Sequence, residues 1–210
     1  MKLYNANFSP NALRVRAVAH ELGVDLEIVQ VDIRAGDNRA AEFLARNPNA
    51  KVPVLEDGNF VLWESRAICA YLAGLRPEAG LYPEGRKARS LVDQWTWWQA
   101  IHLGPAMQKL SFELFLKEKF GMGDPDLTVV EAEEKATDQF LAVLETGLDG
   151  KDWIAGALSL ADFYLATTFM YRDQAGILLD QYPGVASWID RLEARDSWQE
   201  AVAPLRALFR

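Results

Sequence analysis

The stretch that decides the fold is Asn47-Pro48-Asn49-Ala50-Lys51-Val52-Pro53-Val54-Leu55, which Glu64-Ser65-Arg66-Ala67-Ile68 follows nine residues after Leu55. It predicts a strand opened by a proline, a hairpin at Asp57-Gly58, a second strand over residues 60–63 and a helix that begins at Ser65. A proline removes a hydrogen-bond donor from the ladder, so its usual place is the start or the edge of a strand.

The Val52-Pro53 pair predicts more than a strand start. An X–Pro bond adopts the cis form at modest cost. A cis bond here would leave the backbone N–H and C=O of Val52 free of the sheet and open to a peptide-like ligand. The Glu64-Ser65 pair meets a helix N-terminus, which favours a carboxylate. Together they indicate a small anionic peptide as the ligand.

Composition narrows the class of protein. The 210 residues are half hydrophobic and 25% charged, which is typical of a globular protein with one large or two small domains. The net charge of −8 disfavours a nucleic-acid or anionic-membrane partner. The single cysteine excludes an intrachain disulfide, and the chain has neither an apolar signal segment nor a run long enough to span a membrane. We therefore expect a cytoplasmic protein.

The chain divides into two halves of different character. Up to about residue 74 the pattern alternates as strand, helix, strand, then a short helical turn, two strands and a helix, which predicts a thioredoxin-like α/β layer. Residues 76–85 are rich in Gly, Pro and charge and predict a linker. Every later periodic segment is helical. The prediction is an α/β domain over residues 1–75 and an all-α domain over residues 86–210.

The expected elements have these ranges. The first half should hold strands over residues 3–5 and 26–31, helices over 10–22 and 65–73, and a helical turn over 43–46. The second half should hold helices over residues 86–119, 128–148, 159–174 and 185–194, with a last one ending at Phe209. Gly104-Pro105 should kink the first of these.

Ser9-Pro10 places a good N-cap residue before a proline at the first helical position. A hydroxyl at the positive end of a helix can donate a hydrogen bond to a thiolate, and a helix N-terminus lowers the pKa of a thiol. From spacing alone, Ser9 is equally well explained as a cap and nothing more.

Ser65 has the same two readings, since it could simply cap its helix. Glu64 beside it suits an anion socket only where the ligand carries an ammonium close to its carboxylate, as an α-amino acid does. Arg39 and Lys51 could meet further ligand carboxylates, although such residues are often ordinary solvated charges.

Residues 1–75 resemble the glutathione-binding half of the soluble glutathione transferases. Three segments carry the resemblance: Met1-Lys2-Leu3-Tyr4 running into Ser9 with Arg14-Val15, then Asn47-Pro48 with Lys51-Val52-Pro53, and Glu64-Ser65-Arg66-Ala67-Ile68. Past the linker, Leu81-Tyr82-Pro83, Lys109-Leu110 and Phe112-Glu113 are similar to the plant-type phi class and to bacterial serine-type or theta-like members. Gly156-Ala157-Leu158-Ser159-Leu160-Ala161-Asp162 resembles the family's buried capping motif, and Ser159 with Asp162 three residues on also forms a capping box unaided.

The resemblance implies a role for each site residue. Ser9 would activate the glutathione thiol, and Val52 would pair through its backbone with the cysteinyl unit beside a cis Pro53. Glu64 and Ser65 would hold the γ-glutamyl head. Arg39 and Lys51 would lie near the glycyl carboxylate, and no metal is implied.

Departures from the family pattern leave three points open. Asn38-Arg39 stand where the plant-type class has a His-Lys pair, so the glycyl end would be held differently. Asn49 replaces an aromatic residue that locks some dimers. Ser9-Pro10-Asn11 also resembles the Thr-Pro-Asn of the bacterial nu class, which reduces disulfides with glutathione, so Asn11 is a second candidate donor to the sulfur.

Two other residues are weaker candidates for the thiol chemistry. Tyr4 is a rival donor to the thiolate, although a strand position would alternate it with Leu3. Cys69 lies within the predicted helix over residues 65–73 and is expected in the core, and no cysteine lies near Ser9.

A second-substrate pocket is expected against the start of the all-α domain. Leu103 and Met107 are spaced i, i+4 around the Gly104-Pro105 kink and could line it with Pro10 and Asn11. His102 is a polar candidate at the same level.

The resemblance leaves three functions open: attack of the glutathione thiolate on a hydrophobic electrophile, glutathione-dependent disulfide or peroxide reduction at the same site, and non-catalytic ligand binding or scaffolding. A homodimer is implied, with the helices that carry Arg66 and Asp93 at its interface.

Overall fold

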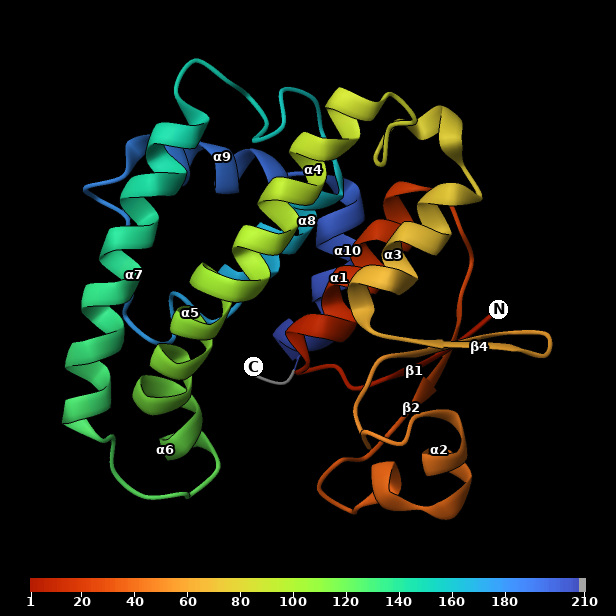
Figure 1. The fold of residues 1–210 in the computed structure, drawn as a ribbon. Coiled ribbons are helices and arrows are strands. Elements are labelled where there is room, and N and C mark those ends of the chain that lie inside the picture. Colours follow the sequence, from red (N-terminus) through yellow and green to blue (C-terminus); the bar gives the residue numbers. More distant parts are fainter. Residues whose placement is uncertain (208–210) are drawn as a thin grey trace. The chain divides into compact units, whose positions relative to one another are not determined.

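The computed structural model describes residues 1–207, which form two compact units. The first unit comprises residues 1–83 together with the chain from Glu193 onward, and the second comprises residues 84–192. Figure 1 labels the elements of both units. No helix among the described residues is long and apolar enough to cross a membrane.

The first unit is built on a four-stranded sheet in the order β2-β1-β3-β4. β1 pairs with β2 in parallel and with β3 antiparallel, and β3 pairs antiparallel with β4. Val54 lies opposite Trp63 and Asp57 opposite Phe60, which closes the predicted hairpin. The strands are β1 (Lys2–Asn5), β2 (Glu27–Gln30), β3 (Val54–Asp57) and β4 (Phe60–Trp63).

Helices lie on both sides of this sheet. α1 and α3 pack against each other on one side, and α2 lies on the other, as Figure 1 shows. This is the thioredoxin-like layer that the strand and helix order predicted. The helices of this part are α1 (Pro10–Glu21), η1 (Asp37–Arg39), α2 (Ala41–Arg46), α3 (Ser65–Gly74) and η2 (Pro77–Ala79). Gly23, with φ of 61°, follows α1 in the left-handed conformation that ends a helix.

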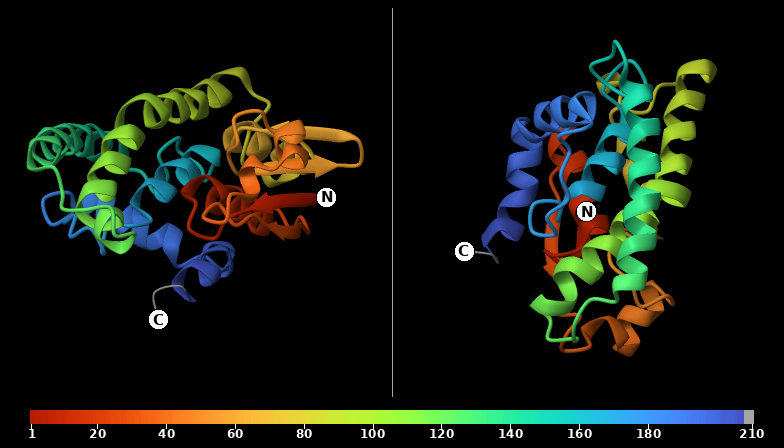
Figure 2. Two further views of the ribbon diagram at one scale, coloured as in Figure 1. Left: turned by 90° about the horizontal axis from the view of Figure 1, so that it is seen from below. Right: turned by 90° about the vertical axis from the view of Figure 1, so that its left-hand side faces the viewer.

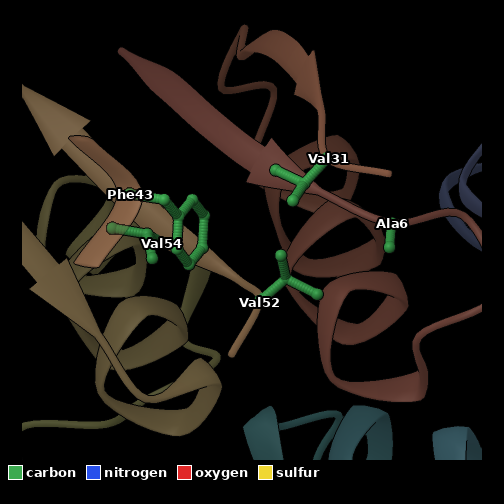
Figure 3. Close-up of a cluster of buried hydrophobic side chains, with 5 residues drawn as sticks. All are labelled: Ala6, Val31, Phe43, Val52 and Val54. Atoms are coloured by element: carbon green, nitrogen blue, oxygen red, sulfur yellow. The ribbon is translucent and has the colours of Figure 1, made fainter. Parts of the chain in front are cut away.

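One hydrophobic cluster fills the space under α2. Figure 3 shows its five buried side chains, from Ala6, Val31, Phe43, Val52 and Val54. Phe43 comes from α2, whereas Val52 comes from the segment that leads into β3. Burying a side chain of this size contributes about 1.5–3 kcal/mol, so the cluster fixes the start of β3 against α2.

The last helix, α10 (Asp196–Arg206), packs on α1 within the first unit. The Arg16 guanidinium donates to the backbone oxygen of Ala201 through Nη2 (3.0 Å) and Nε (3.3 Å), and to the Asn5 side chain. Burial lowers the pKa of Arg16 to about 10. At the other end of α1, Glu21 accepts from Arg195 Nη2 (2.6 Å) and Ser197 Oγ (2.6 Å).

These contacts group α10 with the α/β layer, whereas the sequence-based division placed every residue from 86 to 210 in one all-α domain. That division, with its linker at residues 76–85, stays a prediction. The expected end of the last helix at Phe209 lies outside the described residues.

The second unit consists of helices throughout its described elements. α7 is the longest of them and runs the length of the unit, as Figure 2 shows. The helices are α4 (Arg86–Trp98), η3 (Gln99–Leu103), α5 (Gly104–Ser111), η4 (Phe112–Leu116), α6 (Lys117–Lys119), α7 (Leu127–Leu148), α8 (Leu160–Ala166), η5 (Thr167–Phe169) and α9 (Pro183–Glu193).

The predicted helix over residues 86–119 is interrupted at the expected place. Residues Gln99–Leu103 form a π-helical turn before Gly104-Pro105, because Pro105 has no N–H to continue the ladder. A Cβ atom at position 104 would lie 2.6 Å from the Gln99 backbone oxygen, so only glycine fits there. A second π-helical turn, Phe112–Leu116, was not predicted.

The helix predicted over residues 159–174 is shorter than expected, and that prediction was wrong at its C-terminal end. α8 and η5 end at Phe169. The hydroxyls of Thr167 and Thr168 both donate to the backbone oxygen of Tyr164, at 3.1 and 3.3 Å. Such side-chain bonds compete with the helical ladder for the same acceptor.

The predicted capping box at the start of α8 is present and fully buried. Asp162 accepts from the backbone N–H groups of Ile154 (2.9 Å) and Ser159 (2.9 Å), from the Ser159 hydroxyl (3.0 Å) and from the Trp188 indole (3.0 Å). The network joins the loop before α8, the helix itself and α9. Burial raises the pKa of the Asp162 carboxyl.

Replacing Asp162 should therefore cost far more stability than replacing its capping partner. In Asp162→Ala, two backbone N–H donors and one indole N–H lose their acceptor at about 1–3 kcal/mol each, so we expect a loss of at least about 3 kcal/mol. Ser159→Ala is the matched control and should cost about 1 kcal/mol, as an ordinary cap does. Urea unfolding of the variants measures both, and equal losses would contradict the central role of Asp162.

Candidate functional site

Ser9 lies where the sequence predicted, directly before α1. Its Oγ accepts a hydrogen bond from the backbone N–H of Ala12 at 3.3 Å, and Pro10 occupies the first turn. The side chain is half-buried. Because the cap uses a lone pair of the oxygen, the hydroxyl proton remains available for a further acceptor at the positive end of the helix.

A buried hydrogen-bonded chain joins the starts of α1 and α3. Arg14 Nη1 donates to Ser65 Oγ at 3.1 Å, and Ser65 Oγ donates to Asn11 Oδ1 at 3.5 Å. Arg14 is 3% exposed and Ser65 is 4% exposed. Asn11 itself is exposed. Ser9, Asn11 and Ser65 are therefore tied to one corner of the first unit.

Arg14 was not predicted to have a role of its own. The sequence feature that could have indicated one is an arginine within an otherwise apolar helical stretch, and in the structure the positions from Ala12 to Ala19 are all buried. A buried charge needs hydrogen-bond partners, so such an arginine marks a polar site.

The prediction that Ser65 caps α3 was wrong. Ser65 is the first residue of the helix, and the capping position is Glu64, whose side chain caps no N–H group. The Ser65 hydroxyl is committed to Arg14 and Asn11 instead. No described side chain caps the first N–H groups of α3, which leaves them for an anionic ligand.

Glu64 has a strained backbone. Its φ is 73° and its ψ is 110°, in a region that non-glycine residues rarely adopt. Such a conformation costs about 1–3 kcal/mol and is concentrated at functional sites. The exposed Glu64 carboxylate stands beside the uncapped helix start.

The Val52-Pro53 bond is cis, as the sequence predicted. The ladder of β3 begins at Val54, so Val52 lies before the paired part of the strand. Its side chain is 7% exposed and belongs to the cluster under α2 (Figure 3). The core therefore holds the Val52 side chain while its backbone stays outside the ladder.

Two buried asparagines shape the loop before Val52. Asn47 Nδ2 donates to the backbone oxygen of Lys51 at 2.7 Å, and Asn47 Oδ1 accepts from the Asn49 backbone at 3.0 Å. Asn38 Nδ2 donates to the backbone oxygen of Ala50 at 2.7 Å. Ala50 has a φ of 54°, so the loop has a left-handed turn that these bonds support.

Arg39 and Lys51 flank this loop, in η1 and in the loop itself. Both side chains are exposed. Within residues 1–207, neither side chain has a hydrogen bond or an ion pair, so both charges are open to a carboxylate. Asn38, in contrast, is a buried scaffold residue rather than a surface one.

Tyr4 takes no part in this arrangement, and Cys69 contacts it only by donating its thiol to the backbone oxygen of Arg14 at 3.7 Å. Tyr4 donates its hydroxyl to Glu56 Oε2 at 3.0 Å, and the Arg46 guanidinium lies over its ring. Burial and the bond to Glu56 raise the pKa of Tyr4. Cys69 is fully buried, as predicted.

The residues predicted for a second-substrate pocket are divided between the two units. Pro10 is half-buried at the start of α1. His102 is exposed, and its ring lies against those of Trp98 and Phe140. Leu103 and Met107 are fully buried, and α5 packs against α7. Their part in a pocket stays a prediction.

The described residues hold no cluster of three or more His, Cys, Asp or Glu side chains that could bind a metal ion. The arrangement that is present consists of an N-cap hydroxyl, an uncapped helix start, a free backbone beside a cis proline and two open cations.

Comparisons with known proteins agree with this arrangement. Residues 1–74 match the family model described as glutathione S-transferase, N-terminal domain, and residues 104–196 match glutathione S-transferase, C-terminal domain. A probable glutathione S-transferase GSTF2 from Oryza sativa subsp. japonica is 34% identical over 98% of this chain and 97% of its own length.

Solved structures agree as well. A glutathione S-transferase I bound with lactoylglutathione has a TM-score of 0.89 at 32% identity, covering 97% of this chain and 98% of that one. Glutathione S-transferase I from mais in complex with an atrazine glutathione conjugate has the same score and identity, covering 98% and 97%.

The relatives from Oryza sativa and mais are plant proteins, which supports the resemblance to the plant-type phi class and not the resemblance to bacterial members. The family supplies glutathione as the substrate that fits an anionic-peptide site. The chain therefore belongs to the glutathione S-transferase family and is an enzyme that acts on glutathione and an electrophile.

Proposed function

We propose that Ser9 activates the thiol of glutathione as a thiolate, which then attacks a carbon atom of a hydrophobic electrophile. The observation that carries this is the Ser9 hydroxyl, which accepts from Ala12 N–H and keeps its proton for the sulfur. The reaction forms a carbon–sulfur bond and breaks the bond between the same carbon and its leaving group. The thiol proton is released to solvent.

The energetic requirement is modest. A free thiol with a pKa near 8.5 is only a few per cent ionised at pH 7. Each unit by which the site lowers the thiol pKa corresponds to about 1.4 kcal/mol in favour of the thiolate. A hydrogen bond to a charged acceptor contributes about 1.5–3 kcal/mol, so one hydroxyl and a helix N-terminus can provide the needed shift.

Glutathione binds, in this proposal, along the Val52-Pro53 segment. The free N–H and C=O of Val52 pair with the cysteinyl unit. The γ-glutamyl carboxylate meets the backbone N–H of Ser65 and the uncapped start of α3, and the ammonium of the γ-glutamyl unit meets Glu64. Arg39 and Lys51 meet the glycyl carboxylate. The open charges of both cations and the exposed carboxylate of Glu64 support these assignments.

In this proposal the electrophile binds against apolar side chains, and the part of Pro10, His102, Leu103 and Met107 in that binding stays a prediction from the sequence. The similar mais enzyme was solved with an atrazine glutathione conjugate, which supports an aromatic electrophile with a displaceable group. His102 is the polar member of the set and is exposed.

A second candidate function, reduction of a disulfide or peroxide by glutathione, is favoured by one contact. Asn11 Oδ1 accepts from Ser65 Oγ, which directs the Asn11 amide so that its Nδ2 is a second donor for the sulfur. Asn11 belongs to the Ser9-Pro10-Asn11 segment that resembles the Thr-Pro-Asn of the nu class. A purely non-catalytic role would not require Ser9, a free Val52 backbone and the Glu64-Ser65 pair together.

We propose a homodimer in the cytoplasm, with the helices that carry Arg66 and Asp93 at its interface. Trp97 and Ile101 are 62% and 63% exposed on the second unit, which supports a covered apolar surface. Asn49 stands where some members of the family have an aromatic residue that locks the dimer, so this dimer would form without that aromatic contact.

We also propose that the chain is a serine-type member of the family, whereas a bacterial source stays a prediction from sequence.

Loosening the loop before Val52 should weaken glutathione binding. Asn47→Ala removes the bonds to Lys51 and to Asn49, and the loss of about 1 kcal/mol should raise the KM for glutathione about fivefold with little change in kcat. Asn49→Ala is the matched control, because it removes only the side-chain bond from Asn49 Nδ2 to Asn47 Oδ1 and retains the backbone donor, so its effect should be small. Steady-state kinetics at fixed electrophile concentration measures both, and equal effects would contradict the role of Asn47.

Removing the Ser9 hydroxyl should impair chemistry rather than binding. Ser9→Ala should lower turnover at neutral pH about 10- to 100-fold, because a hydrogen bond to the thiolate is lost, and glutathione affinity should stay nearly unchanged. The pH at which activity rises should move upward, toward the pKa of the free thiol. Ser9→Thr keeps the hydroxyl and should retain most activity, whereas unchanged turnover in Ser9→Ala would exclude this role.

Two substrates distinguish the candidate reactions. We expect greater activity with 1-chloro-2,4-dinitrobenzene than with hydroxyethyl disulfide, and Asn11→Ala should affect the second reaction more. The reverse order of activities would favour the reductase. A melting temperature that glutathione does not raise would count against both enzyme functions.

A further inference from the structure

The second unit contains an open cavity of about 320 Å³ that no residue proposed for glutathione lines. Its walls come from α7, from the helical segment that includes Leu110, and from the loop of residues 176–182. Leu110 and Leu141 are buried and apolar, whereas Leu178, which also lines the cavity, is 73% exposed. The volume is within the range that small-molecule sites occupy.

Carboxylates give the cavity its charge. Glu134 and Asp138 lie four residues apart on α7, and Asp180 comes from the loop. All three are exposed. None of the described residues that line the cavity is basic. The cavity therefore has apolar and polar walls in similar measure, and the charged side chains that line it are all negative.

Tyr182 holds one of these carboxylates in place. Its hydroxyl donates to the Asp138 carboxylate and also lies 3.1 Å from the Asp138 backbone oxygen. Desolvation, the bond to Asp138, and the charges of Asp138 and Glu145 raise the pKa of Tyr182 to about 12.

Thr137 lines the same cavity and is 3% exposed. Its Oγ1 is buried and has no hydrogen-bond partner among the described residues. A buried hydroxyl without a partner costs about 1–3 kcal/mol, and such groups are rare in native structures. A ligand that brings a donor to this oxygen would remove that cost.

We propose that this cavity binds a small organic cation with an apolar body, such as an arylalkyl ammonium ion. The ammonium would donate to Thr137 Oγ1 and lie among Glu134, Asp138 and Asp180. The apolar body would cover Leu110, Leu141 and Leu178. Anions, glutathione included, would be repelled by the same carboxylates, so the site would be separate in chemistry from the glutathione site.

Three ligands with one ring system test the charge requirement. We expect 1-naphthylmethylammonium to bind with measurable heat, 1-naphthalenemethanol to bind more weakly, and 1-naphthaleneacetate not to bind. Binding of the cation should weaken as salt is added, because the carboxylates are exposed. Saturating glutathione should leave it in place. Equal binding of all three ligands, or displacement of the cation by glutathione, would overturn the proposal.

Variants locate the binding to this cavity. Glu134→Gln combined with Asp138→Asn should weaken binding of the cation about fivefold or more, since each exposed pair contributes up to about 1 kcal/mol. Glu131→Gln is the matched control, because Glu131 is an exposed carboxylate of α7 that does not line the cavity. Equal weakening in the control would reduce the effect to the net charge of the chain and overturn the site.

Thr137→Val gives two readouts of opposite sign. Removing an unpartnered hydroxyl should raise the melting temperature of the free protein by about 2–4 °C. The same change should weaken binding of 1-naphthylmethylammonium, because its ammonium loses an acceptor. A variant that is more stable and still binds the cation with unchanged affinity would overturn the role of Thr137 and with it the proposed site.

Discussion

The hydrogen bond from Arg14 to Ser65 is the interaction on which the proposed glutathione site depends. It is buried, and it joins the second turn of α1 to the first residue of α3. The capping residue of α3 is Glu64, which has a strained backbone and whose side chain caps no N–H group, so the start of α3 has no side-chain cap. An anion at that helix start would supply what the missing cap does not.

The remaining part of the site is supported by the core. Val52 is anchored by a side chain in the cluster under α2, and its backbone lies before the ladder of β3. Asn47 and Asn38 hold the loop that leads to it through the backbone oxygens of Lys51 and Ala50. The site thus places polar backbone groups for a ligand by burying apolar side chains next to them, which keeps the geometry fixed before binding.

Two buried polar groups of the second unit differ in whether described residues satisfy their hydrogen bonds. Asp162 accepts four hydrogen bonds and joins the loop before α8 to α9, so its burial is fully compensated. Thr137 Oγ1 is compensated by no described residue. The first group is explained by the fold alone. The second group is the one with which the cation proposed for this cavity would pair.

Local sequence determined the elements and their ends, because caps and turns act over a few residues. Ser9-Pro10 before α1, Gly23 after it, the Val52-Pro53 pair and the capping box at Asp162 could all be read directly. The tertiary structure alone decided which groups meet across the chain. Arg14 and Ser65 are 51 residues apart, and Arg16 and Ala201 are 185 apart, so no periodic pattern connects them. It also decided the early end of the helix after Phe169 and the partner of the Ser65 hydroxyl, because the groups that these hydroxyls bond to come together only in the folded chain.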